Sequence, residues 1–353
     1  MRIAVLTNDY PPRIRGGVGR IAERQVEMLK GAGHEVRVWF SETVWPEESK
    51  RKRFMRHLRD LRATSNLVSE ICDWKPDVLL THNLTGCGFG TPRAVQSRGV
   101  RWTHMLHDVQ LFEPCGQLKN ARRVTQWQIF WIWLRFFALG HPDLVVSPTK
   151  WLLKQHQKRG FFRFGKTRCE ILPNPGPSID RCERHAHDPL RLLFVGRVTP
   201  DKGSQFLLQL VKKFTRPFEL HIVGSGSDLE RFTTHAVVHG MLEQHNVLEL
   251  MKECDVLLVP SLIEENQPTV ILEAASVGLP VIASNKRGMI ETLGRAAYGL
   301  GTGDPQAWVN AINDLTQDPI QYGYQVERMY EVAKEHDPEI YREKFLSLLT
   351  SNL

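Results

Sequence analysis

Two glutamates eight residues apart, Glu265 and Glu273, are the residues of this chain best suited to chemistry. They follow a run typical of a buried strand, residues 255–260, and Pro268 between them suits the first turn of a helix. A carboxylate on an otherwise apolar helix needs a polar partner, and a sugar diol can donate one hydroxyl to each carboxylate oxygen. The N–H groups that begin such a helix favour phosphate. This strand–loop–helix unit is therefore predicted to hold a phosphate and two sugars.

Two positively charged residues, Arg197 and Lys202, follow another predicted strand at residues 191–195. Gly203 then allows a tight turn into the next helix. Two cations beside a helix N-terminus suit a diphosphate leaving group, whose negative charge grows as its bond breaks. A surface Arg and Lys on an ordinary turn are the alternative, and the glutamate pair downstream favours the functional interpretation.

Two glycine-rich turns and a histidine also follow predicted strands. Gly16 and Gly17 belong to a loop of three glycines in four residues, which would let the backbone approach a ligand more closely than a plain loop. The Gly-x-Gly at residues 224–226 is weaker, and a simple tight turn explains it equally well. His107, followed by Asp108, could donate a hydrogen bond to a sugar or phosphate, although a lone histidine is more often structural.

Segments with the patterns of strands and helices alternate along the chain, as in parallel doubly wound sheets. The predicted strands are 2–7, 35–40, 77–81, 101–106, 144–147, 191–195, 218–223, 255–259 and 280–283, and the predicted helices are 18–31, 203–214, 227–234, 268–278 and most of 304–350. Three prolines and a glycine within residues 173–177 predict a linker. The fold class is therefore α/β, with two similar domains in tandem. Because such sheets bind ligands at the carboxyl ends of their strands, a cleft between the domains is expected.

Composition restricts the class of protein further. The 353 residues suggest two domains of ordinary size. The net charge of +7 is uneven, since residues 1–176 carry 29 Lys and Arg against 15 Asp and Glu, and residues 177–353 carry 17 against 24. The basic half favours nucleic acid, anionic lipid or a phosphorylated substrate, with chance asymmetry as the alternative. Six scattered cysteines, and a strand rather than a signal peptide at residues 2–7, predict a cytoplasmic protein.

Two further segments suggest a surface role. Residues 50–62 form a basic, partly amphipathic helix, and residues 126–138 are strongly aromatic but too short, and interrupted by Arg135, to span a bilayer. Together they could contact the inner face of an anionic membrane peripherally. A solvated basic helix beside a buried core helix is the alternative, and the sequence slightly favours it.

In their order along nearly the whole chain, these motifs resemble glycosyltransferase family 4, whose retaining enzymes have the GT-B fold of two Rossmann-like domains facing across a cleft. Glu265 and Glu273 resemble the family's E-x7-E motif, and Arg197 with Lys202 resembles its phosphate-binding pair. His107 resembles its active-site histidine. The resemblance implies an N-terminal acceptor domain at residues 1–175, a C-terminal donor domain at 190–335, and a helix at 336–353 that packs back on the first domain.

The resemblance also implies a hexosyltransferase (EC 2.4) of cell-surface polysaccharide biosynthesis. It would move a sugar from a UDP-, GDP- or ADP-sugar to a glycan or lipid-linked acceptor, with retention and without a metal or cofactor. Glu273 would hold the ribose, Glu265 the transferred sugar, Arg197 and Lys202 the diphosphate, and His107 the donor sugar. The further donor-binding residues that the resemblance implies are Gly16, Gly17, Met241, Leu242, Asn266, Gln267, Thr269 and Val270.

Other functions fit less well. Sugar-nucleotide epimerases and phosphorylases also use two Rossmann-like domains, but a phosphorylase needs a pyridoxal-binding lysine, for which the sequence shows no motif. The pI of about 9.1 suggests a nucleic-acid-binding protein. Its basic residues follow no readout pattern, so nucleic acid is not an expected partner.

Overall fold

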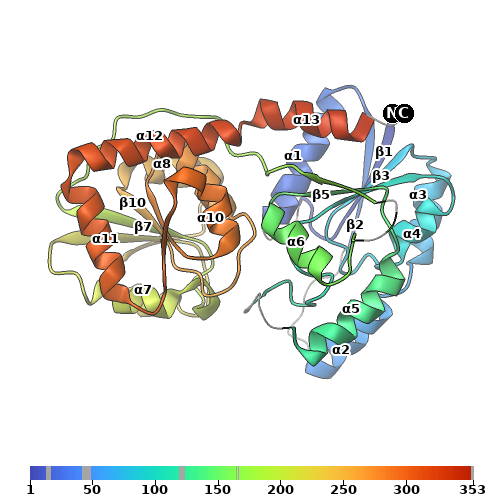
Figure 1. The fold of residues 1–353 in the computed structure, drawn as a ribbon, viewed down its shortest axis with the longest axis horizontal. Helices are drawn as coiled ribbons and strands as arrows, with labels where there is room; N and C mark the ends of the chain where they lie inside the picture. The colour runs from blue at the N-terminus through green and yellow to red at the C-terminus, as the bar shows by residue number, and fades with distance from the viewer. Residues whose placement is uncertain (13–16, 42–48, 119–123, 164, 166, 351–353) are drawn as a thin grey trace. The chain divides into compact units, whose positions relative to one another are not determined.

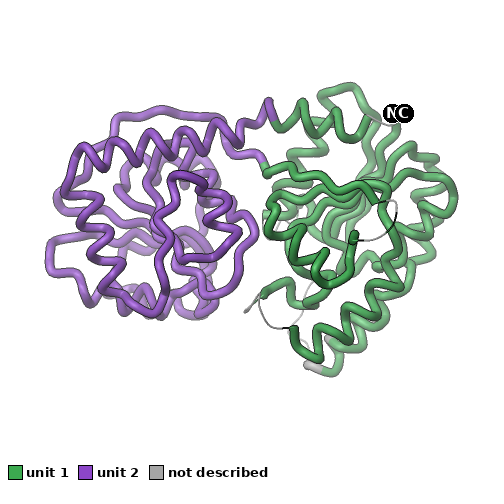
Figure 2. The backbone as a smooth tube through the Cα atoms, in the orientation of Figure 1, with its two compact units in different colours: residues 1–174, 341–353 green, residues 175–340 purple. Residues whose placement is uncertain are grey.

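The computed structural model describes the chain except residues 13–16, 42–48, 119–123, 164, 166 and 351–353. The backbone divides into two compact units, of which unit 1 comprises residues 1–174 and 341–353 and unit 2 comprises residues 175–340 (Figures 1 and 2). Each unit contains a six-stranded sheet in which all neighbouring strands are parallel. The predicted α/β class with two doubly wound sheets is confirmed.

The sheet of unit 1 has the strand order β2-β1-β3-β4-β5-β6. Its strands are β1 (Arg2–Thr7), β2 (Glu35–Phe40), β3 (Val78–Thr81), β4 (Arg101–Met105), β5 (Leu144–Ser147) and β6 (Arg168–Ile171). Its helices are α1 (Gly17–Gly31), α2 (Lys50–Arg59), α3 (Ser65–Asp73), α4 (Thr91–Gln96), α5 (Gln126–Leu139) and α6 (Lys150–Lys158). The interior strands β3 and β5 are buried along their whole length, as expected when helices cover both faces of a parallel sheet.

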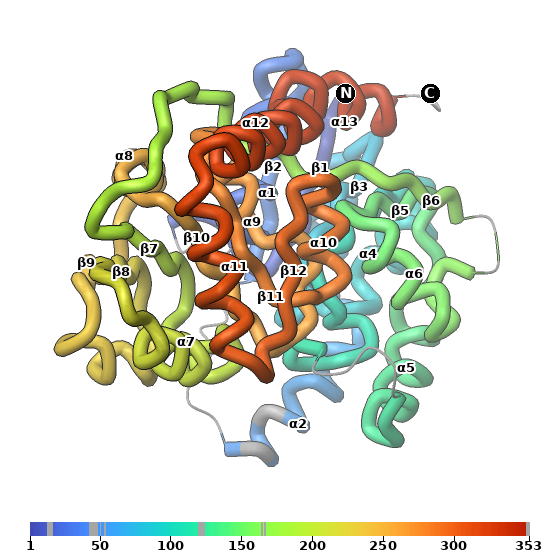
Figure 3. Tube along the Cα trace, turned by 60° about the vertical axis from the view of Figure 1, so that its left-hand side comes forward, coloured from blue at the N-terminus to red at the C-terminus, as the bar shows by residue number. Residues whose placement is uncertain are grey.

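The sheet of unit 2 has the order β12-β11-β10-β7-β8-β9. Its strands are β7 (Leu190–Val195), β8 (Phe218–Val223), β9 (Val237–Gly240), β10 (Val256–Val259), β11 (Val281–Ser284) and β12 (Tyr298–Leu300). Its helices are η1 (Pro200–Lys202), α7 (Ser204–Val211), η2 (Leu229–Phe232), α8 (Gln244–Glu253), α9 (Thr269–Ser276), α10 (Arg287–Leu293), η3 (Gly294–Ala296), α11 (Pro305–Gln317) and α12 (Pro319–Glu335). Helices α11 and α12 pack against each other (Figures 1 and 3).

Some elements differ from the expectation. The predicted helix at residues 227–234 is only the 3-10 turn η2, because the Asp228 N–H donates to the Val198 carbonyl at 3.0 Å and ties the segment to a neighbouring loop. The outer strands β6, β9 and β12 are short and partly exposed, so they lack the apolar runs that marked the other strands.

Helix α13 (Pro338–Thr350) belongs mainly to unit 1, although it follows unit 2 along the chain. Its residues Tyr341, Phe345 and Leu349 are buried in the same hydrophobic cluster as the β1 residues Ile3 and Val5. Gln25 of α1 donates its side-chain N–H to the Tyr341 hydroxyl at 2.5 Å. The end of the chain therefore completes the core of unit 1.

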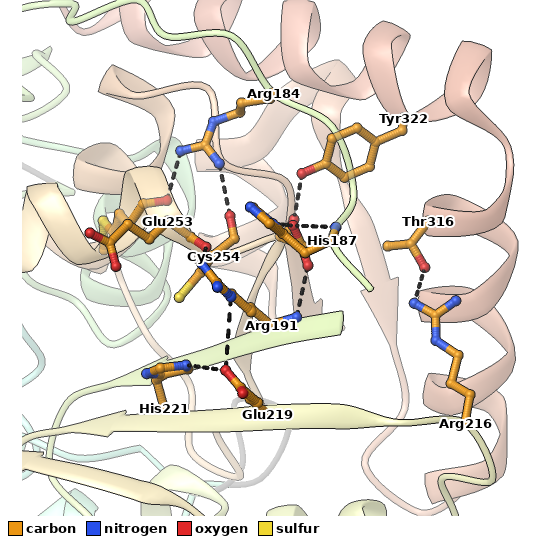
Figure 4. A network of polar contacts seen from close by, with 12 residues as sticks. Arg184, His187, Arg191, Arg216, Glu219, His221, Glu253, Cys254, Thr316 and Tyr322 are labelled. Carbon is orange, nitrogen blue, oxygen red and sulfur yellow. Dashed lines mark hydrogen bonds and ion pairs between the residues drawn. The ribbon is translucent and has the colours of Figure 1, made fainter. Parts of the chain in front are cut away.

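The segment before β7, for which the sequence predicts a linker, is fixed to unit 2 without forming a helix or strand. Arg184 donates to the carbonyl of Cys254 at 2.9 Å (Figure 4). It also donates to the carbonyls of Val277 and Met251 at 2.6 and 2.7 Å. The fully buried Asp255 accepts from the His187 ring at 2.6 Å and from the Arg191 N–H at 2.7 Å. These bonds satisfy carbonyls at the carboxyl ends of α8 and α9 and the backbone N–H of Arg191 in β7.

Asp255→Ala should therefore lower the free energy of unfolding by about 2–4 kcal/mol, because it leaves the ring N–H of His187 and the backbone N–H of Arg191 without their buried acceptor. Urea denaturation would measure the change. Glu243→Ala is the matched control, since that carboxylate is mostly exposed, and should shift the free energy by less than about 0.5 kcal/mol. Equal effects of the two substitutions would contradict this account of the anchor.

Candidate active site

The predicted cation and carboxylate meet where the strand order of unit 2 reverses. The chain proceeds from β7 to one side of the sheet and from β10 to the other, so the loops after these two adjacent strands diverge. Lys202 ends η1, after β7, and Glu265 lies in the loop after β10. The Lys202 ammonium contacts Oε1 of Glu265, and the Ser261 hydroxyl donates to the same oxygen at 2.9 Å. This is the position at which doubly wound sheets bind ligands.

Close packing of the two loops brings Lys202 to Glu265. The Leu262 N–H donates to the Asp201 carbonyl at 2.9 Å. Gly203 has a φ of +86°, and a Cβ atom there would lie 2.1 Å from the Pro260 carbonyl oxygen. Only glycine satisfies both conditions, so the tight turn predicted at Gly203 sets the position of the preceding lysine.

Arg197 lies in the same loop but is more exposed than Lys202. Its guanidinium Nη2 is 2.9 Å from the Asp201 carboxylate, and its side chain is 55% exposed. The Gly-x-Gly turn after β8 packs directly on this loop, because a Cβ at Gly224 would lie 1.9 Å from the Gly196 carbonyl oxygen. The glycine at position 224 is thus explained by loop packing, which is the simpler of its two interpretations.

Glu273 is buried in α9, with only 6% of the residue exposed. The Gln244 amide at the start of α8 donates to its Oε1 at 3.0 Å. The turn before α8 contains Met241, which is exposed, and Leu242, which is half-buried against the core. The carboxylate therefore has the polar partner that its burial requires, beside the turn predicted to read the base.

The remaining predicted donor-binding residues of unit 2 lie at the start of α9. Pro268 is the N-cap residue and offers no side-chain acceptor, and Thr269 and Val270 open the helix. Gln267 is buried and its Nε2 lies 3.0 Å from Nε2 of His336, while Asn266 is half-buried in the preceding loop.

In unit 1 the strand order reverses between β1 and β3. Gly17 begins α1 after β1, and Gly16 lies outside the described residues. The Cys87 thiol of the loop after β3 donates to the Thr7 carbonyl at the end of β1, at 3.2 Å. Gly17 and Gly19 therefore lie in the first turn of α1, the helix that follows β1 at the reversal point, and not in a loop.

His107 follows β4 and pairs with a second histidine, His82, which follows the adjacent strand β3. Nδ1 of His82 lies 2.8 Å from Nε2 of His107, and the two rings stack at 5.1 Å. Asp108 accepts from the Asn83 amide at 2.7 Å and from the Gln110 N–H at 2.8 Å. His82 and Asn83, which follow β3, thus make hydrogen bonds to His107 and Asp108, which follow β4.

Burial keeps these imidazoles neutral at pH 7. It lowers the pKa of His107 to about 4, and it lowers the pKa of His82 well below the ordinary value, with the charge of His107 contributing. Nε2 of His82 is buried without a hydrogen-bond partner among the described residues. A proton on that nitrogen would be an unpaired buried donor, so the geometry favours donation from Nδ1 of His82 to His107. His107 then carries its own proton on Nδ1.

Four polar residues that contact the predicted site were not identified from the sequence: His82, Asn83, Gln244 and Ser261. The first two follow a strand at the edge where His107 was predicted, so the same rule would have found them. Ser261 likewise follows a strand, two residues after β10, whereas Gln244 carried no comparable signal, because its partner Glu273 lies 29 positions away on another helix. Across the described ranges, no three His, Cys, Asp or Glu side chains are grouped so that they could hold a metal ion.

Two family profiles match the chain. Residues 15–175 match the family described as Glycosyltransferase Family 4, and residues 189–318 match that described as Glycosyl transferases group 1. The first match covers most of unit 1 and the second covers the whole sheet of unit 2.

Curated relatives include two bacterial proteins of polysaccharide synthesis. The amylovoran biosynthesis glycosyltransferase AmsK of Erwinia amylovora is 32% identical over 151 residues, which is 37% of this chain and 37% of that protein. The putative teichuronic acid biosynthesis glycosyltransferase TuaC of Bacillus subtilis is 25% identical over 389 residues, covering 95% of this chain and 94% of its own length. The chain thus matches about a third of the first relative and nearly all of the second.

Solved structures share the fold. HepE of Anabaena in complex with UDP has a TM-score of 0.72 at 15% identity, and the comparison covers 99% of this chain and 100% of HepE. The same protein in complex with UDP-glucose has a TM-score of 0.70 at 16% identity.

We expect Gly203→Ala to misplace Lys202, because the new methyl group would collide with the Pro260 carbonyl in a backbone conformation that alanine disfavours. The substitution should cost more than about 1 kcal/mol of unfolding free energy, measured by urea denaturation. Gly323→Ala in α12 is the control, since nothing lies within 4 Å of its new methyl and helix propensity improves by roughly 0.5–1 kcal/mol. A neutral Gly203→Ala protein would contradict the packing argument.

His104 lies in β4, three residues before His107, and the pH dependence of stability tests its burial. Burial lowers the pKa of His104 to about 3 from an ordinary value of 6.5, so between these values only the unfolded chain binds the proton. Stability from this residue is therefore present above pH 6.5 and is lost as the pH falls. In His104→Gln, the drop in unfolding free energy between about pH 7.5 and pH 5.5 should be smaller than in the parent by about 1 kcal/mol. A drop in His104→Gln identical to that of the parent would refute the assignment.

Proposed function

This chain belongs to glycosyltransferase family 4 and has its GT-B fold, and from that membership we propose that it transfers a hexosyl group from a UDP-sugar to a glycan or lipid-linked acceptor. The reaction proposed retains the anomeric configuration and needs no metal or cofactor. The complexes of HepE with UDP and UDP-glucose support UDP over GDP or ADP. The relatives named for amylovoran and teichuronic acid synthesis support a cell-surface polysaccharide as product.

The contact between Lys202 and Glu265 at the reversal point of unit 2 carries the proposal. On this proposal, Lys202 and Arg197 bind the diphosphate and stabilise the charge that develops as the bond to the sugar breaks. Glu265 then accepts hydrogen bonds from hydroxyls of the transferred sugar, and Glu273 holds the ribose diol in place of Gln244. No protein nucleophile is invoked. The acceptor hydroxyl attacks from the face that the diphosphate leaves, and its proton passes to the departing phosphate oxygen.

The remaining predicted residues take supporting roles in this proposal. Backbone groups at Met241 and Leu242 contact the base, and the N–H groups of Thr269 and Val270 at the start of α9 contact phosphate. Asn266 and Gln267 line the donor sugar, and Gly16 and Gly17 approach the phosphates. His107 donates from Nδ1 to a hydroxyl of the donor sugar; this role follows from the family resemblance and from the tautomer that His82 favours.

For the chain as a whole, a cytoplasmic site of action is proposed, with peripheral contact to the inner face of a membrane through residues 50–62 and 126–138. This would bring the enzyme to a lipid-linked acceptor. In the part of the chain that the structure describes, no helix is both long and apolar enough to cross a membrane.

UDP-sugars should raise the melting temperature of the protein, whereas GDP- and ADP-sugars should not.

Lys202→Ala should lower acceptor-dependent release of UDP by roughly 100-fold, because the leaving diphosphate loses one preorganised cation that stabilises its charge. Glu273→Ala should weaken UDP binding in calorimetry by roughly 10- to 100-fold.

Lys213→Ala and Glu230→Ala, which alter exposed residues away from these contacts, are the controls and should retain parental turnover and binding. Parental values in both Lys202→Ala and Glu273→Ala would exclude the assignment. Conversion of the donor sugar without any acceptor would instead indicate an epimerase, so dependence of UDP release on the acceptor separates the two activities.

A further inference from the structure

Helix α5 buries polar residues and exposes apolar ones, which is the reverse of an ordinary surface helix. Its inward stripe contains Gln128 and Arg135 together with Trp131 and Leu139. Its outward side consists of large apolar residues, here called the aromatic face: Trp127, Ile129, Phe130, Trp133, Phe136 and Phe137. A core helix would bury such residues, and a helix bathed in water would expose the polar ones instead. This arrangement rules out the buried core helix that the sequence slightly favoured.

The buried arginine shows why the helix cannot simply turn over. Arg135 is fully buried, with its guanidinium 4.4 Å from the Phe89 ring centre and 5.1 Å from that of Trp131. Burial lowers the pKa of Arg135 to about 10, and the nearby carboxylates of Asp60 and Asp108 oppose that shift by favouring the charged form. Rotating α5 to bury its aromatic face would pull this cation away from both carboxylates. The exposure of the aromatic face is therefore a consequence of how unit 1 is packed.

Helix α2 adds positive charge beside the aromatic face. The ring of Phe54 lies 5.9 Å from that of Trp127 and 6.3 Å from that of Phe130. The two helices therefore lie side by side (Figure 1). Six of the ten residues of α2 are Lys or Arg and none is acidic, and Arg51 and Lys52 are exposed. Met55 on the same helix is also exposed.

We propose that α5 lies in the plane of an anionic membrane surface, with its aromatic face among the acyl chains and headgroups and the cations of α2 against the lipid phosphates. Trp and Phe beside Lys and Arg are the side chains that a lipid–water interface accommodates best. With 14 residues, α5 is too short to cross a bilayer core of roughly 30 Å, so it would lie on the membrane. An anionic lipid surface explains both the apolar residues and the one-sided charge. The inference concerns binding only and does not depend on the proposed transfer reaction.

Flotation with vesicles tests this surface without any enzyme assay. At about 0.1 M salt the protein should float with vesicles that contain about 30% phosphatidylglycerol, and it should float weakly with pure phosphatidylcholine. The double variant Trp133→Ser/Phe137→Ser should reduce flotation at least about ten-fold, since these side chains are 61% and 59% exposed and their rings contact each other. Arg51→Glu/Lys52→Glu should abolish the preference for anionic vesicles.

Ile320→Ser/Tyr324→Ser removes comparably exposed apolar side chains from α12 in unit 2 and should float like the parent. Unchanged circular dichroism and melting temperature would show that the α5 variant is folded. Absence of flotation in the parent, or equal flotation of the α5 variant, would overturn the proposal. A parent that is dimeric without vesicles, and becomes monomeric in the α5 variant, would also overturn it and assign the face to a second copy of the chain.

Discussion

The candidate site depends on one ion pair, that of Lys202 with Glu265, which joins the two loops leaving adjacent strands where the sheet of unit 2 reverses. These residues are 63 positions apart, and only the pairing of β7 with β10 makes them neighbours. The pair lets both charges be partly buried without an uncompensated cost of desolvation. In the proposed reaction, an incoming diphosphate replaces the Glu265 carboxylate as the partner of Lys202. A ligand that brings hydroxyl groups for Glu265 as well as phosphate would therefore bind better than inorganic phosphate.

Much of this arrangement could be predicted from the sequence, because a parallel sheet imposes a simple rule. Residues that directly follow strands meet at one edge, and that rule placed Lys202, Glu265 and His107 correctly at the carboxyl ends of their strands. The partners that complete each contact were harder to predict. Gln244 reaches Glu273 only through the relative positions of two helices, which periodicity does not specify. The outer strands lacked apolar runs because fewer helices cover them.

Helix α5 shows a different limit of sequence patterns. An arginine within an aromatic helix ordinarily marks the side that faces water. Here Arg135 is buried against the rings of Phe89 and Trp131, near the carboxylates of Asp60 and Asp108. Those groups come from segments distant in the sequence, such as Asp60, whose carboxylate accepts the N–H groups of Gly86 and Gly88. Local periodicity contains no information about them.

The contribution of α13 to unit 1 bears on how the polypeptide folds as it is made. Tyr341, Phe345 and Leu349 close the cluster around β1, yet more than 330 residues separate them from that strand. During translation, most of unit 1 therefore leaves the ribosome before α13 can cover the apolar cluster around β1. Unit 2 is synthesised in the meantime and can complete its own core. The core of unit 1 can therefore be completed only after all of unit 2 has been synthesised, which leaves this apolar patch accessible to chaperones for longer.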